Sequence, residues 1–90
     1  MTEAASIDAT VARDVRAFIQ ESFLYMRPDL ELQDDDELLG QGIIDSLGFV
    51  ELVEEIQTRY GITIADVEIT EENLGSVSAI VRFVAAKRSM

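Results

Sequence analysis

The segment from Ser46 to Gly61 constrains the fold most strongly, because its apolar residues recur at the spacing of one helix face. The residues of this face are Phe49, Leu52, Val53, Ile56 and Tyr60. Gly61 follows the last of them and suits the left-handed residue that ends many helices. The sequence therefore predicts a helix over residues 46–60 with one apolar face and one acidic face.

A long first helix is expected before Pro28. Its apolar positions at helical spacing are Val11, Val15, Phe18, Ile19 and Met26, and its possible N-caps are Ser6, Asp8 and Thr10. Because proline disfavours helical backbone in the residue before it, this helix should end near residues 25–27. Residues 1–6 resemble a frayed terminus.

The C-terminal segment predicts a last helix that begins after Ser76 as N-cap. Its inward positions are Val77, Ile80, Val81 and Val84, and it closes with Lys87 and Arg88, whose charges suit a helix C-terminus. The segment before it should hold a turn or two of helix around residues 65–67 or 70–73. One proline, five glycines and few aromatic residues favour helices over a β-sandwich. We expect an all-α fold in one domain, residues 1–90.

A long connection runs from Pro28 to Asp45 between the first two predicted helices. Loops longer than about 12–15 residues are uncommon in compact domains and are usually functional or disordered. Apolar residues along this loop should hold it against the core: Leu30, Leu32, Leu38, Leu39, Ile43 and Ile44. We therefore expect an ordered loop that lies close to a functional site.

The charge of the chain limits its partners. Eighteen acidic and seven basic residues give a formal net charge of −11, which repels nucleic acid and anionic lipid and favours proteins with basic patches. Such a charge also favours a monomer and should loosen the fold by self-repulsion. The N-terminus lacks the pattern of a signal peptide, and no run approaches the roughly 18 apolar residues of a membrane span. We expect a cytoplasmic protein that binds neither nucleic acid nor membrane.

Catalysis and metal binding are both disfavoured by the residues present. The chain has no histidine and no cysteine, so a serine nucleophile would lack its usual base. The acidic run that begins at Asp34 does not fit a calcium loop, because the sixth position holds Leu39 instead of glycine and the twelfth holds Asp45 instead of glutamate. Acid–base work by Asp45 and Glu51 is disfavoured because exposed carboxylates on a helix are usually only solvated. We expect no catalytic residue, no metal and no enzyme activity.

Ser46 admits two interpretations. It can cap the helix that it begins, because a serine oxygen readily accepts a backbone N–H there. Alternatively, an anionic group attached to its hydroxyl would be stabilised by the positive end of the helix dipole. The acidic residues Glu51, Glu54 and Glu55 likewise form either a solvated face or a docking surface for basic partners.

The run Gly-Ile-Ile-Asp45-Ser46-Leu47 followed by an acidic amphipathic helix resembles the acyl carrier protein family, which holds 4'-phosphopantetheine. The resemblance extends over nearly the whole chain and implies a four-helix bundle with a long loop between helices 1 and 2 and a short third helix. It implies that a phosphopantetheinyl transferase attaches the cofactor from coenzyme A to Ser46, with Asp45 and Leu47 beside it. It also implies partner contacts at Leu47, Glu51, Val53, Glu54 and Glu55.

The same resemblance implies a stand-alone carrier that holds acyl or aminoacyl groups as thioesters and passes them from a loading enzyme to a downstream synthase or transferase. Within this class, the alternative to an acyl load delivered by a transferase is an aminoacyl load, as in D-alanyl carriers, delivered by an adenylating enzyme. Gly48 replaces an acidic residue of typical fatty-acid carriers, and the motif is more similar to D-alanyl carrier proteins and to carriers of polyketide or nonribosomal peptide pathways. The cargo could rest against Phe18, Phe49, Val53 and Ile64. The alternative is an acidic helical adaptor without a prosthetic group, in which Ser46 only caps a helix and Glu51 and Glu54 bind a basic protein.

Overall fold

The computed structural model describes residues 3–27 and 29–88. Its helices are α1 (Glu3–Phe23), α2 (Ser46–Tyr60), α3 (Glu71–Leu74) and α4 (Val77–Arg88), with a short 3-10 helix, η1 (Asp66–Glu68), before α3. Strands are absent from these two ranges. The prediction of an all-α fold with a long loop between the first two helices and a short third helix is confirmed.

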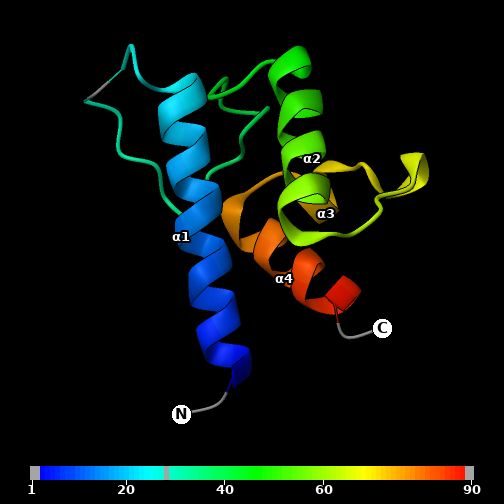
Figure 1. The fold of residues 1–90 in the computed structure, drawn as a ribbon. Helices are drawn as coiled ribbons and strands as arrows, with labels where there is room; N and C mark the ends of the chain where they lie inside the picture. The colour runs from blue at the N-terminus through cyan, green and yellow to red at the C-terminus, as the bar shows by residue number, and fades with distance from the viewer. Residues whose placement is uncertain (1–2, 28, 89–90) are drawn as a thin grey trace.

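The helices surround one apolar core (Figure 1). Helix α4 packs against both α1 and α3, and α1 also contacts α2. The largest fully buried side chains come from every part of the chain: Val11, Ile19, Leu38, Leu52, Ile56, Leu74, Val77, Ile80 and Val84. In Figure 1 the C-terminal end of α1 and the N-terminal end of α2 lie at the same end of the bundle. Within the described ranges, no helix is both long and apolar enough to cross a membrane.

Helix α2 has the predicted bounds and the predicted buried face. Phe49, Leu52, Val53 and Ile56 are buried, and Tyr60 is half-buried. Gly61 has a φ of 63° and a ψ of 36°, and its N–H donates to the carbonyl of Gln57. This left-handed residue ends the helix, as its glycine predicted.

Helix α1 differs from the prediction at both ends. It begins at Glu3, so the described part of the expected frayed end is helical and the expected caps lie inside the helix; residues 1–2 are outside the described residues. It ends at Phe23. The Leu24 N–H still bonds to the carbonyls of Ile19 and Gln20, and the Arg27 N–H then turns back to the carbonyl of Leu24. Met26 is 77% exposed and lies beyond the end of the helix, so its predicted place among the apolar positions of this helix was wrong.

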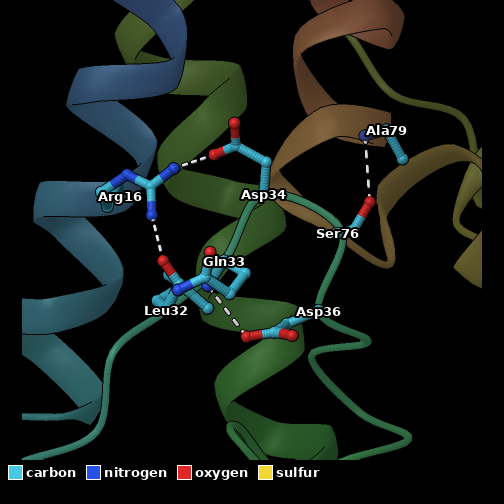
Figure 2. Close-up of polar contacts among 7 residues, drawn as sticks. All are labelled: Arg16, Leu32, Gln33, Asp34, Asp36, Ser76 and Ala79. Carbon is cyan, nitrogen blue, oxygen red and sulfur yellow. Dashed lines mark hydrogen bonds and ion pairs between the residues drawn. The ribbon is translucent and has the colours of Figure 1, made fainter.

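The loop between α1 and α2 is held to the bundle by its side chains and its backbone. Leu32, Leu38, Ile43 and Ile44 are buried, as predicted. Figure 2 shows the Arg16 guanidinium, from α1, donating to the Leu32 carbonyl and to the Asp34 carboxylate. The Asp34 carbonyl accepts the Ser78 N–H of α4 at 2.9 Å, and the Leu38 N–H donates to the Gly75 carbonyl at 2.8 Å. These contacts tie the loop to α1, to α4 and to the residue that follows α3.

The segment before α4 contains both of the short helical turns that the sequence suggested. Thr70 Oγ1 accepts the Asn73 N–H at 3.1 Å and caps α3. Ser76 Oγ accepts the Ala79 N–H at 3.1 Å at the start of α4, as predicted (Figure 2). The Lys87 ammonium contacts Glu68 of η1 at 2.8 Å, so it ties η1 to the C-terminal turn of α4.

Candidate cofactor-attachment site

Asp45, and not Ser46, caps helix α2. Its backbone is extended, with a φ of −91° and a ψ of −178°, and its Oδ1 accepts the Gly48 N–H at 2.7 Å. Its carbonyl accepts the first intrahelical bond, from the Phe49 N–H at 2.8 Å. The interpretation of Ser46 as the cap was therefore wrong, because the carboxylate one residue earlier makes the bond that the hydroxyl would have made. A carboxylate also interacts more favourably with the positive end of the helix dipole.

Ser46 is the first residue of α2, and its side chain is exposed. Over residues 3–27 and 29–88, its hydroxyl makes no hydrogen bond, and the N–H groups of Ser46 and Leu47 have no acceptor. Open N–H groups at a helix N-terminus favour anions such as phosphate. The hydroxyl is thus accessible to another enzyme, and an anionic group attached to it would lie beside unpaired donors.

Gly48 brings the end of α1 into contact with this first turn. A Cβ atom at Gly48 would lie 2.9 Å from Cε1 of Phe23 and 3.1 Å from the capping Oδ1 of Asp45. The Phe23 ring also packs edge-on against Phe18, with ring centroids 5.8 Å apart. The sequence drew attention to Gly48, but it did not predict a contact with Phe23. A glycine inside a helix, where it costs stability, is the one signal of a close approach that the sequence offered.

The acidic residues predicted to contact partners differ in their surroundings. Glu51 and Glu54 are exposed. Glu55 accepts two hydrogen bonds from Arg59, at 2.9 Å from Nε and 2.7 Å from Nη2, and this contact raises the pKa of Arg59. Within the described part of the chain, Glu51 and Glu54 are therefore the carboxylates of this face without an ion pair, whereas much of the charge of Glu55 is balanced within its own helix.

Val53 does not lie on the surface that partners can reach. Its side chain is 4% exposed and belongs to the core, so the expected partner contact by Val53 was wrong. It shares the inward face with Phe49 and Ile56, four and three residues away, as helical spacing requires. Leu47 and Val50 are the exposed apolar residues of α2, with 69% and 51% of their surface accessible.

The residues expected to line a cargo site are packed into the bundle. Phe49, Val53 and Ile64 are buried, and Phe18 is half-buried against the core. The described surface cavities, of about 240, 290 and 260 Å³, are lined by other residues, mostly from the loop, α3 and α4. None of these three cavities brings the four expected residues together.

Comparison with known proteins identifies the family of this chain. Residues 14–84 match the family described as the phosphopantetheine attachment site. The chain belongs to this family of carrier proteins. Carriers of this family bear a covalently attached 4'-phosphopantetheine and function through it, so the adaptor without a prosthetic group was the wrong alternative. Carrier proteins generally interact with a phosphopantetheinyl transferase and with loading enzymes, and they are generally not catalytic.

Three relatives are similar to this carrier over most of its chain and most of their own length. It is 35% identical over 71 residues to a D-alanyl carrier protein of Streptococcus suis (strain 98HAH33), covering 79% of this chain and 86% of the relative. It is 31% identical over 78 residues to a D-alanyl carrier protein of Streptococcus thermophilus (strain ATCC BAA-491 / LMD-9), covering 84% and 98%. It is 28% identical over 79 residues to the D-alanyl carrier protein of Streptococcus sanguinis (strain SK36), covering 88% and 96%.

Proposed function

We propose that this carrier bears its 4'-phosphopantetheine on the hydroxyl of Ser46. The proposal is carried by the Ser46 hydroxyl, at the first residue of α2, which is exposed and has no hydrogen-bond partner among the residues that the structure describes. Asp45 leaves this hydroxyl free because its own carboxylate caps the helix. Leu47 flanks the serine with an exposed apolar side chain.

The residues around Ser46 fit a phosphodiester. The N–H groups of Ser46 and Leu47 and the positive end of α2 would stabilise its negative charge. The cofactor supplies a terminal thiol that holds an acyl or aminoacyl group as a thioester. Asp45 keeps the first turn in place through the Gly48 N–H, so the serine is presented on a rigid element. Because the chain has no histidine or cysteine, the attachment chemistry belongs to the transferase, and we assign no catalytic residue to the carrier itself.

Partner enzymes are proposed to dock against the free acidic face of α2. Glu51 and Glu54 would meet basic side chains, and Glu55 would contribute less because it is paired with Arg59. These partners are the transferase, a loading enzyme, and a downstream synthase or transferase that accepts the load. The carrier acts as a monomer, because its net charge of −11 opposes self-association. It acts in the cytoplasm, where coenzyme A is available.

We infer that the load is aminoacyl, with D-alanine as the first candidate. The similarity to proteins named D-alanyl carrier proteins, over 86% and 98% of two of them, supports this choice. Gly48 supports the same choice, because typical fatty-acid carriers have an acidic residue at this position after the motif leucine. Acyl loads from polyketide or nonribosomal peptide pathways are the alternative, and no relative named above favours them.

The intact mass of the protein tests the proposed attachment. The protein is incubated with coenzyme A, magnesium and a promiscuous phosphopantetheinyl transferase. Ser46→Ala is the test variant, and Ser22→Ala, at another exposed serine, is its matched control. We expect a gain of one phosphopantetheinyl group on the parent and on Ser22→Ala, and none on Ser46→Ala. A parent that gains nothing, with a control carrier fully modified, would contradict the assignment.

The stability of the Ser46→Ala variant separates loss of attachment from loss of fold. Because Asp45 provides the cap, removing the Ser46 hydroxyl should change the free energy of unfolding by no more than about 0.5 kcal/mol, as at an ordinary surface site. Asp45→Ala should cost about 0.5–2 kcal/mol, as loss of an N-cap does. Thermal melts of the two variants measure this difference.

A further inference from the structure

Exposed apolar side chains gather on two segments of the chain. In the part of the chain that the structure describes, the exposed large hydrophobic residues are Tyr25, Met26, Leu47, Val50 and Val67. Single exposed apolar residues are normal on protein surfaces. Four of these five, however, belong to two short segments, one directly after α1 and one in the first turns of α2.

These two segments lie at the same end of the bundle. In Figure 1 the end of α1 and the start of α2 are both found there. The Phe23 ring reaches the backbone of Gly48, since a Cβ atom there would lie only 2.9 Å from it. Tyr25 and Met26 follow this contact by two and three residues, and Leu47 precedes it by one. The end of α1 is thus anchored directly to the turn that carries Ser46.

The surroundings of these apolar residues indicate what kind of partner would cover them. Glu51 and Glu54 continue the surface along α2 as free carboxylates, on a chain with a net charge of −11. A complementary protein would therefore have an apolar centre flanked by basic side chains. A typical interface buries about 800 Å² on each partner, enough to reach both segments on a molecule whose extents are 36 × 32 × 20 Å.

We propose that Tyr25 and Met26 form, together with Leu47 and Val50, the surface on which the phosphopantetheinyl transferase docks. This inference rests on the proposed attachment at Ser46, because the enzyme that modifies this serine must approach the same end of the bundle. It adds the end of α1 to the acidic face of α2 as a determinant of docking. Tyr25 and Met26 act in binding only, since they contribute no group to the reaction.

Steady-state kinetics of modification test this proposal on the full chain. The substrate is the protein without cofactor, and the enzyme is the promiscuous transferase with coenzyme A and magnesium. The test variant is Tyr25→Ser with Met26→Ser, Leu47→Ser probes the α2 part of the surface, and Val67→Ser is the matched control on η1. Because all of these side chains are exposed, thermal melts should be nearly unchanged and the readout is free of folding effects.

We expect the double variant and Leu47→Ser each to raise the KM for the carrier about tenfold with kcat nearly unchanged, as for loss of exposed apolar anchors. Val67→Ser should stay within about twofold of the parent. The proposal is overturned if the double variant has the KM of the parent, whatever Leu47→Ser does, or if Val67→Ser raises KM as much as the double variant. Failure of the proposed attachment looks different, because the parent itself would then remain unmodified while a control carrier is modified.

Discussion

Replacing Gly48 with alanine tests how the attachment turn is built. Alanine is more favourable than glycine inside a helix by about 1 kcal/mol, so a helix considered alone would become more stable. The new Cβ atom, however, would lie 2.9 and 3.3 Å from two Phe23 ring carbons and 3.1 Å from Asp45 Oδ1. Overpacking of this kind costs about 1–3 kcal/mol. We expect a net loss of about 1 kcal/mol, which lowers the melting temperature by about 4–8 °C in a domain of this size.

A second substitution decides whether Phe23 is the cause. In a Phe23→Ala background, the two ring carbons nearest to the new Cβ atom are gone. Gly48→Ala should then be neutral or should stabilise by up to about 1 kcal/mol, the helix propensity alone. The loss of stability that Gly48→Ala causes in the parent should therefore disappear, or become a gain, in the Phe23→Ala background. The difference between the two effects is a coupling energy of about 1–2 kcal/mol.

Denaturant unfolding of the parent, the two single variants and the double variant measures this cycle. Gly40→Ala is a control, because the nearest atom to its Cβ is Glu37 Oε1, at the end of a flexible side chain that can turn away. A Gly48→Ala variant that is more stable than the parent, or that has the same effect in both backgrounds, would contradict this prediction. Either result would mean that the ring of Phe23 does not press on the first turn of α2.

Three further predictions concern charges. The hydrogen bond from Lys87, and then the one from the Ala65 N–H, lower the pKa of Glu68. The stability that Glu68 contributes is therefore present above its ordinary pKa of 4.5 and is lost as the pH falls through the lowered pKa. Thermal melts on both sides of pH 4.5 should show that acid lowers the melting temperature less for Glu68→Gln than for the parent. Arg16→Met should cost about 1 kcal/mol and speed amide exchange at Leu38, because the loop loses its contacts to α1; unchanged exchange would mean that the loop is held by its leucines alone. Raising the ionic strength should raise the melting temperature because a net charge of −11 repels itself, and an unchanged midpoint would contradict this.

Helix α2 was predictable to the residue because the signals that fix it are local. Its apolar spacing, a capping residue at its start and Gly61 at its end lie within one stretch of sequence. The choice between Asp45 and Ser46 as cap was not predictable, since both residues favour that position and the register of the first turn decides between them. The spacing had also placed Val53 inward; only the resemblance to carriers suggested a partner contact there, and the structure follows the spacing.

The end of α1 depends on contacts that the sequence does not reveal. Pro28 limits how far the helix can continue, but the helix stops at Phe23, where the ring packs on Gly48 from a distant part of the chain. The exposure of Tyr25 and Met26 follows from that stop, because both residues lie beyond the helix and outside its periodicity. The proposed docking surface could therefore be found only once the two segments were seen at the same end of the bundle (Figure 1).

The most direct test of the proposed attachment is to locate the cofactor within the chain. After incubation with coenzyme A, magnesium and the transferase, the protein is digested, and the peptide with added mass is fragmented in a mass spectrometer. We expect one phosphopantetheinyl group, on Ser46, the exposed first residue of α2. A group on any other serine or threonine, or no group beside a fully modified control carrier, would contradict this expectation.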